Sequence, residues 1–564
     1  MGELKREYDL IVIGGGINGL TAAAYLQKAG LEVAVFERRD EVGTHCATEE
    51  VGMPGIKYNL HACGLTVLAS PAYTELELER FGLEMLTVSE WGYFHPFLDG
   101  TAILFHQCDA NAQYNVWKEI NSHDAEVFRK LSQYFGPYWI ELIDKFFYEI
   151  PSMETQQLLM EIISRCPGVP SGWENMTGVE LADLMFEDER IKTALLTQSG
   201  VIDMQAWDKL IGAIGTLLMS FSMVVPWNFT ARGGSHAIPH ALVRCFMHHG
   251  GKVFQGCPVE KIIMENGEAK GVVLSKYAVY PEAEIRARKA VISNLTPVPT
   301  FIDLVGEDKL SPEIVTAVKG YDYDQSVVTV YYVFSEFPEW IQAAAFPEIN
   351  RTYTFNVGIE NPQDIVRLSE DYEYGRLPDP PICAGGCFHG FSVADPTQAP
   401  PGLFPILLWA NLPADPKEHG GFENWDELRE GYADKIDDMF SAHVINFKRA
   451  KVSRIVTTPL DIYRRNASAI LGAWGGGPIT PAQFFLNRPF AGCGAPRTPV
   501  SGLYISQSLG ATPGGTTLNT GLTAARVVAE DFGIRNQDWW NVKAIEPYID
   551  FSNKKWGKWN PIVA

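Results

Sequence analysis

The sequence predicts an α/β fold, and three observations near its start support this. Residues 10–13 form a short apolar run with β-branched side chains, which is typical of a buried parallel strand. A glycine-rich turn at 14–19 comes next, and residues 20–29 then combine helix formers with an apolar face. Residues 31–36 are again apolar and predict a second strand.

The glycine-rich turn has the spacing G-x-G-x-x-G, which predicts a dinucleotide site. Gly14 permits a tight turn, Gly16 lets the backbone approach a pyrophosphate, and Gly19 lets helix and strand pack closely. The N-terminus of the following helix offers free N–H groups to the phosphates. Glu37 closes the second strand, where an acid binds ribose hydroxyls and repels a 2′-phosphate. This arrangement disfavours NADP.

Composition and charge exclude several classes of protein. The chain has 564 residues, of which 46% are hydrophobic, and a formal net charge of −22. Such an acidic surface repels phosphate backbones, so we expect no nucleic-acid partner. No apolar run reaches the roughly 18 residues of a spanning helix, and the start lacks the apolar segment of a secretory signal. Nine scattered cysteines without a Cys-x-x-Cys pair favour a reducing, cytoplasmic setting.

The residues after the second strand indicate the cofactor. The run Glu37–Gly43 (ERRDEVG) resembles the ER-x-x-x-x-G-G extension of FAD enzymes with the glutathione-reductase-type fold. More narrowly, the chain resembles the phytoene desaturase-like family, which includes carotenoid desaturases and retinol saturases. The segments that carry this resemblance span the chain from end to end: 11–43, 231–274 with 287–297, 483–506 and 513–533.

The resemblance implies a Rossmann-like FAD-binding domain assembled from discontinuous segments. We expect residues 1–70, 230–300 and 490–535 to form it around one cofactor. An α+β substrate-binding domain with a mixed sheet and helices would comprise 71–229 and 301–489. Residues 536–564 would form a C-terminal tail.

The resemblance also implies which residues contact FAD. Gly14, Gly16 and Gly19 would face the pyrophosphate, the backbone of Val259 the adenine, and Pro513–Gly515 the flavin ring. The full expected set is Gly14, Gly16, Ile17, Asn18, Gly19, Glu37, Arg38, Gly43, Thr44, Val259, Pro513, Gly514, Gly515 and Thr520. Thr44 and Gln507 stand where the family has glycine, so the known carotenoid substrates do not carry over.

The expected reaction is desaturation, or its reverse, at a C–C bond of an apolar isoprenoid or alicyclic substrate. A hydride would move to or from flavin N5, and a proton would leave the adjacent carbon. The candidates for moving this proton are His61, Tyr58 and Tyr504, with His61 preferred because imidazole titrates near neutral pH. A structural role for His61 stays open. His45 and Cys46 are alternative points of covalent flavin attachment.

Two other functions remain possible on the sequence alone. A flavin amine oxidase shares the fold and acts on C–N bonds, although the Cys that follows the Pro-Gly-Gly motif in some of those enzymes is missing. A non-enzymatic FAD protein with a binding or assembly role is the other alternative, suggested by Thr44 and Gln507. We expect no metal site, because His236 and His240 lack the glutamate of an H-E-x-x-H motif.

The remaining segments carry weaker signals. Residues 124–147 and 178–199 predict long helices, and the aromatic set at 134–148 is either helix core or the wall of a substrate cavity. Residues 326–334 and 403–412 predict strands of a second sheet, and 361–399 predicts loops. The tail mixes Trp and Lys, so it packs on its own body or in a homo-oligomer, or docks peripherally at a membrane. The electron acceptor is unknown.

Overall fold

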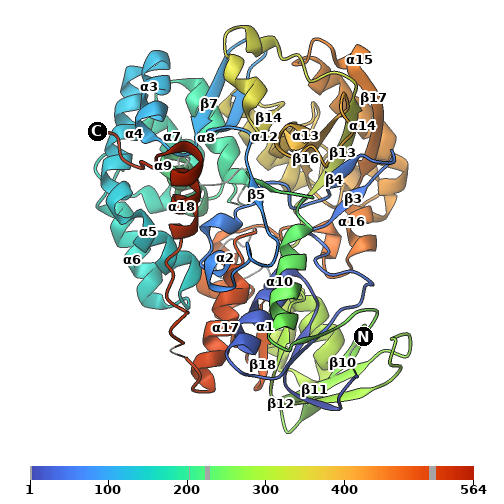
Figure 1. Cartoon of the computed structure of the whole chain (residues 1–564). Coiled ribbons are helices and arrows are strands. Elements are labelled where there is room, and N and C mark those ends of the chain that lie inside the picture. The colour runs from blue at the N-terminus through green and yellow to red at the C-terminus, as the bar shows by residue number, and fades with distance from the viewer. Residues whose placement is uncertain (1–2, 202–203, 223–228, 507–515, 536) are drawn as a thin grey trace.

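The computed structural model describes residues 3–201, 204–222, 229–506, 516–535 and 537–564. Two large sheets lie at opposite ends of the molecule, and a group of helices flanks one side (Figure 1). The first sheet contains the N-terminal strand of the chain. The second sheet is built mainly from strands in the middle and later parts of the chain.

The first sheet has the strand order β10-β11-β12-β1-β2-β9, and β18 also pairs with β12. Its strands are β1 (Glu7–Ile13), β2 (Val33–Phe36), β9 (Lys252–Phe254), β10 (Val259–Glu265), β11 (Glu268–Leu274), β12 (Glu284–Ser293) and β18 (Leu503–Ile505). Pairing is parallel from β18 through β12, β1 and β2 to β9, and antiparallel among β10, β11 and β12. Strands from three distant parts of the sequence therefore meet in one sheet.

Alternation along β1 covers both faces of this sheet. Leu10 and Val12 join the core around helix α1 (Ile17–Lys28), whereas Ile11 and Ile13 join the core on the opposite face. Helix α1 packs against α10 (Ala237–His248) and α17 (Asn519–Asp531). The apolar run predicted at 10–13 is thus buried on both faces, as a parallel strand requires.

The second sheet is mixed and has the order β17-β13-β16-β15-β14-β6-β7. Its strands are β6 (Trp91–Pro96), β7 (Ala102–His106), β13 (Ser326–Phe334), β14 (Thr354–Val357), β15 (Cys383–Phe388), β16 (Phe404–Leu412) and β17 (Lys451–Thr457). Strand β14 runs parallel to β6, and the other pairings are antiparallel. On one face, Phe94 and Phe355 pack with Phe440 of α14 (Trp425–Ser441).

The flanking helices come from residues 110–222, which follow β7 in the sequence. They are α3 (Ala110–Ile120), α4 (Ser122–Phe135), α5 (Trp139–Ile143), α6 (Met153–Ser164), α7 (Gly178–Met185), α8 (Glu189–Val201) and α9 (Ile211–Ser222). The smaller elements are β3 (Thr48–Glu50), β4 (Lys57–Asn59), β5 (Met85–Leu86), β8 (Thr230–Ala231), α2 (Ala72–Glu75), α11 (Pro312–Lys319), α15 (Phe447–Ala450) and α16 (Pro459–Arg465). Among the residues described, no helix combines the length and apolar character needed to cross a bilayer.

Both long helices predicted here are broken. After α4, a 3-10 turn at Gly136–Tyr138 interrupts the helix, because Pro137 cannot donate a backbone hydrogen bond. The short α5 then leads into a π turn at Asp144–Tyr148. The second prediction is split between α7 and α8.

The segment 361–399, predicted as loops, contains α12 (Pro362–Tyr374), β15 and α13 (Phe391–Ala394). That prediction was wrong, because the Asn361–Asp364 capping box and Pro362 start a helix.

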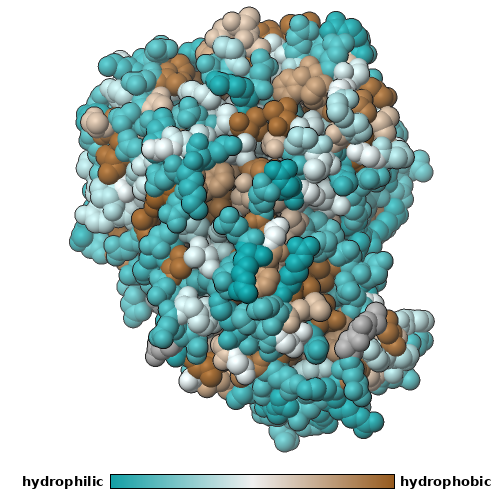
Figure 2. Space-filling view, viewed as in Figure 1, coloured by the Kyte–Doolittle hydropathy of each residue, from teal (hydrophilic) through white to brown (hydrophobic). Residues whose placement is uncertain are grey.

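The C-terminal tail packs along the molecule's own body. Helix α18 (Glu546–Trp556) packs against the 3-10 turn at Val67–Ala69. Trp539 and Trp540 stack on each other and contact Tyr25 of α1 at a tilt, with ring centroids 5.6 and 5.1 Å from the tyrosine ring. On the face shown in Figure 2, hydrophobic residues are scattered between hydrophilic ones.

Candidate functional site

One cavity of about 830 Å³ joins the two sheets. At one end it is lined by the glycine-rich turn after β1, by the end of β2 and by the start of β10. At the other end it is lined by one face of β6, β14, β15 and β16 and by residues of α8 and α9. The loop at 465–476 forms a further part of the wall.

The glycine-rich turn leaves no room for side chains. Gly14 has φ +92°, in the left-handed region that favours glycine. A Cβ at Gly16 would lie 2.4 Å from Nδ2 of Asn294, and a Cβ at Gly19 would lie 2.6 Å from the carbonyl oxygen of Gly14. No side chain caps the N-terminus of α1, so its backbone donors remain available to a phosphate.

Glu37 connects this turn to the next loop. One carboxylate oxygen accepts a hydrogen bond from the backbone N–H of Gly15 at 2.6 Å, and the other accepts one from Arg39 at 2.8 Å. Burial raises the pKa of Glu37 above its ordinary value, against these donors. Glu37 and Val259 both line the cavity, so a carboxylate stands where the ribose of an adenine dinucleotide would lie.

Most of the residues predicted to contact FAD do line this cavity. They are Gly14, Gly16, Ile17, Asn18, Glu37, Arg38, Gly43, Thr44 and Val259. Gly19 and Thr520 are not among the described lining residues: Gly19 lies against Gly14, and the Thr520 hydroxyl donates to the carbonyl of Ser506 at 3.1 Å. Pro513, Gly514 and Gly515 lie outside the described residues. The donors, the glycine cradle and the carboxylate fit FAD.

Several lining residues were not predicted from the sequence. Asn294 and Thr296 follow β12, and Thr516 and Thr517 precede α17. The position of Asn294 directly after a parallel strand next to β1 is a signal that could have identified it, since ligands bind at these strand ends. The loop at 465–476 carries no comparable signal.

The three predicted proton-transfer candidates separate in the structure. His61 lines the cavity. Tyr58 and Tyr504 are not among the described lining residues: the Tyr58 hydroxyl donates to the carbonyl of Tyr332, and the Tyr504 hydroxyl donates to Asp531 at 2.7 Å. Both hydroxyls are committed elsewhere, so of the three candidates His61 is the one that lines the cavity.

The buried His61 lies next to the half-buried His45. Nε2 of His61 is buried and has no hydrogen-bond partner, whereas Nε2 of His45 lies 3.1 Å from the amide nitrogen of Asn466. Burial lowers the pKa of His45 to about 4 and holds the pKa of His61 well below its ordinary value. Both rings are therefore neutral near pH 7. Burial also raises the pKa of the neighbouring Cys46 thiol to about 12, which disfavours the thiolate needed for flavin attachment.

The end of the cavity at the second sheet is mainly apolar and aromatic. Its lining there includes Phe147, Leu218, Met219, Phe388, Trp409 and Trp474. Of the aromatic set predicted at 134–148, Phe147 lines the cavity, whereas Phe135 and Trp139 pack on Phe221 in the helical core.

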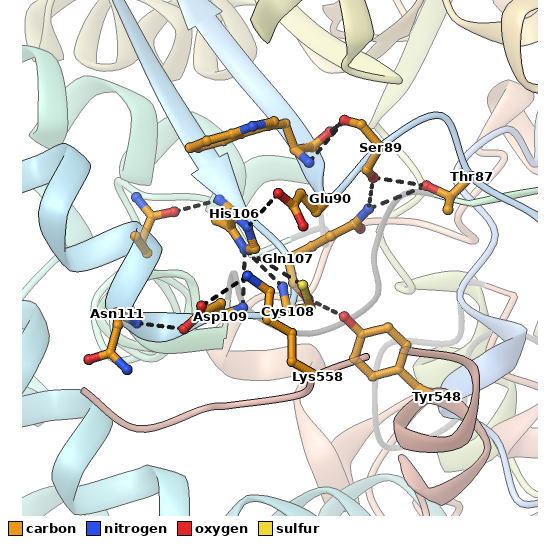
Figure 3. Close-up of polar contacts among 12 residues, drawn as sticks. Thr87, Ser89, Glu90, His106, Gln107, Cys108, Asp109, Asn111, Tyr548 and Lys558 are labelled. Atoms are coloured by element: carbon orange, nitrogen blue, oxygen red, sulfur yellow. Dashed lines mark hydrogen bonds and ion pairs between the residues drawn. The ribbon is translucent and has the colours of Figure 1, made fainter. Parts of the chain in front are cut away.

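Two clusters of three possible metal ligands occur among the described residues. Glu41, His236 and His240 form one on the surface, and Glu90, His106 and Cys108 form the other (Figure 3). In the second, Nδ1 of His106 already accepts the backbone N–H groups of Cys108 and Asp109, at 3.3 and 3.1 Å. Neither cluster lies in the cavity wall.

The turn at 107–109, beside the second cluster, instead holds the tail. Lys558 pairs with Asp109 at 3.2 Å, and the Tyr548 hydroxyl donates to the carbonyl of Gln107 (Figure 3). The Asn560 N–H donates to the carbonyl of Cys108 at 2.8 Å. The tail thus fixes the turn between β7 and α3.

Comparison with known proteins adds an independent line of argument. Residues 12–78 match the family model of the NAD(P)-binding Rossmann-like domain. The chain is 29% identical to a pyridine nucleotide-disulfide oxidoreductase domain-containing protein 2 of Rattus norvegicus, covering 94% of both chains. It is 26% identical to one of the limonene dehydrogenase polypeptides of Castellaniella defragrans, covering 96% of this chain and 97% of that one. A solved structure of putrescine oxidase shares the fold, with a TM-score of 0.55, 16% identity and coverage of 93% and 99%.

Proposed function

We propose that this chain, which belongs to the FAD-dependent oxidoreductase superfamily, is a dehydrogenase that acts on a C–C bond of an apolar isoprenoid or alicyclic substrate. FAD, when bound, supplies the acceptor or donor of the hydride. The name of the limonene dehydrogenase relative supports an alicyclic hydrocarbon skeleton.

The observation that carries the proposal is the continuity of the cavity. The same space is lined by Glu37 and the glycine-rich turn at one end and by Phe388 and Trp409 at the other. An apolar wall on the second sheet would exclude water and hold two carbons in a fixed orientation, which lowers the barrier to hydride transfer by several kcal/mol.

His61 is the residue we propose for the proton. Its Nε2 is buried without a partner, and its ring is neutral near pH 7, so it can accept a proton. The adjacent His45 is held by Asn466 and would keep the ring pair in place.

The lining argues against an amine as substrate. Among the described lining residues contributed by β6, β14, β15 and β16, none carries a carboxylate that would pair with an ammonium group. Two of the acids in the cavity wall, Glu37 and Glu260, lie at the end where the nucleotide would bind. A C–C bond is therefore the preferred target.

An anaerobic substrate panel tests the proposal. The purified protein should carry flavin absorbance, and alicyclic or isoprenoid compounds should bleach it in the absence of oxygen. Bleaching by amines alone would replace the proposal with an amine oxidase, and a flavin that no compound class bleaches would favour a non-enzymatic role. A protein that neither contains nor takes up FAD would contradict both.

A further inference from the structure

A short chain of hydrogen-bonded polar side chains reaches the end of the cavity at the second sheet. Tyr93 and His95 are two residues apart on β6, so their side chains point to the same face of the sheet. Asn356 lies on the neighbouring strand β14, which runs parallel to β6. Tyr93 and Asn356 both line the cavity, and all three side chains are buried.

The direction of each hydrogen bond in this chain is fixed from its far end. The carbonyl oxygen of Ile359 can only accept, so Nε2–H of His95 donates to it, at 2.8 Å. Burial lowers the pKa of His95 to about 4, so the ring carries one proton and its Nδ1 is an acceptor. The hydroxyl of Tyr93, 3.0 Å from Nδ1, must therefore donate to His95.

This leaves the oxygen of Tyr93 able only to accept. The amide nitrogen of Asn356 donates to it at 3.3 Å. The orientation of the Asn356 amide is thus set by the chain rather than chosen freely. Its Oδ1 is buried and has no hydrogen-bond partner in the protein.

We infer that Asn356 is a specificity-determining residue whose Oδ1 accepts a hydrogen bond from a hydroxyl group on the substrate. A buried carbonyl oxygen without a donor is unfavourable, so a ligand that supplies an O–H is preferred over a hydrocarbon. A ketone at this position would place two acceptors against each other. Resting on the proposed function, this inference narrows the substrate class to alcohols built on an apolar skeleton.

Binding to the FAD-loaded protein tests the inference without requiring turnover. The probes are a primary alcohol on one C10 alicyclic skeleton, its methyl ether and the parent hydrocarbon. Binding is read from quenching of tryptophan fluorescence, because Trp409 and Trp474 line the cavity. We expect the alcohol to bind roughly 10-fold more tightly than the ether or the hydrocarbon.

Two variants test whether Asn356 is the residue that makes the alcohol bind more tightly. Asn356→Leu should remove it, whereas Thr354→Val, on the same strand, should keep it because that hydroxyl already donates to the carbonyl of Gly92. Tyr93 is a positioning residue: Tyr93→Phe frees the amide to turn, so the ratio of alcohol to ketone binding should fall several-fold.

Equal binding of the three probes to the wild-type protein would overturn the inference, and this comparison needs no variant. Tighter binding of the primary amine on the same skeleton than of the alcohol would also overturn it. If the alcohol is preferred but no compound bleaches the flavin, the proposed reaction fails while the assignment of Asn356 stands. If hydrocarbons bleach the flavin and the alcohol does not bind more tightly than they do, the proposed reaction stands and the assignment of Asn356 fails.

Discussion

The imidazole rings of His45 and His61 lie 5.1 Å apart in the wall of the cavity, and Nε2 of His61 has no partner. A proton on His61 is disfavoured by the burial of its ring and by any charge on His45. The pair is therefore neutral over a wide range of pH. This neutral state is the one in which we propose that His61 takes the proton from a substrate carbon.

Replacing His61 by Gln tests this role. We expect the rate of anaerobic flavin reduction to fall by about 10²- to 10⁴-fold, the usual contribution of a general base. In the wild-type protein the rate should stay flat between pH 8 and 6, because the pKa of His61 is well below 6.5. Tyr504→Phe is the control, since that hydroxyl is committed to Asp531. An unchanged rate in His61→Gln would discard the assignment.

Glu37→Gln should weaken FAD binding by roughly 10-fold, measured by equilibrium dialysis and by flavin content after purification. The carboxylate accepts one backbone N–H on each oxygen, from Gly15 and Arg39. An amide would place its own N–H₂ against one of these donors. Glu41→Gln, in the same loop but half-exposed, is the matched control and should retain the cofactor. Equal retention by both variants would contradict the role of Glu37.

Gly19→Ala should destabilise the protein by about 1–3 kcal/mol and reduce FAD content. The added Cβ would lie 2.6 Å from the carbonyl oxygen of Gly14 and 3.0 Å from Cβ of Asn294, so the turn after β1 would have to move. Gly431 of α14 has open space around it, and Gly431→Ala should stabilise the helix by up to about 1 kcal/mol. Thermal unfolding of the two variants measures both effects, and shifts of the same sign would contradict the packing argument.

The part of the site nearest the N-terminus was predictable because its signals are local. The strand, the turn and α1 follow one another within residues 7–28, and Glu37 comes directly after β2. The G-x-G-x-x-G spacing indicates the three positions, Gly14, Gly16 and Gly19, where the structure has no room for a side chain.

The substrate end was not predictable in the same way. Asn356 lies beside Tyr93 because β14 pairs with β6, which is far away in sequence, and nothing in either segment specifies that pairing. Asn361 likewise begins a helix through a capping box that a Pro- and Asp-rich composition concealed. Non-local strand pairing and single capping contacts are the physical reasons for these differences.

Stability should fall as the pH drops below 6.5, and His389 is one cause. Its Nδ1 accepts the indole N–H of Trp340 at 3.2 Å, and its Nε2–H donates to the carbonyl of Thr352 at 3.0 Å. Burial lowers its pKa to about 3, so between about pH 6.5 and 3 the unfolded chain binds a proton that the folded chain does not. Each such histidine then removes about 1.4 kcal/mol of stability per pH unit as the pH falls.

His389→Gln should reduce this pH dependence, with chemical denaturation at pH 7, 6 and 5 as the measurement. The exposed His123 provides the control, because His123→Gln leaves the buried histidines unchanged. A slope in His389→Gln equal to that of the wild type would show that other groups determine the acid sensitivity.

We expect the C-terminal tail to stay packed against the rest of the protein and to stabilise it. Trp539 and Trp540 cover Tyr25, Nζ of Lys28 lies 4.2 Å from the centroid of the Trp539 ring, and Lys543 pairs with Asp144 at 3.0 Å. Replacing both tryptophans by Ala should therefore lower stability by about 2 kcal/mol, because half-buried rings and their stacking are lost. Tyr277→Ala, at an exposed aromatic residue, should have little effect. The contrary outcome has two parts: the wild type co-floats with anionic phospholipid vesicles, and the double variant is equally stable but does not co-float. The tryptophans would then bind a membrane, and a role in packing the tail would be wrong.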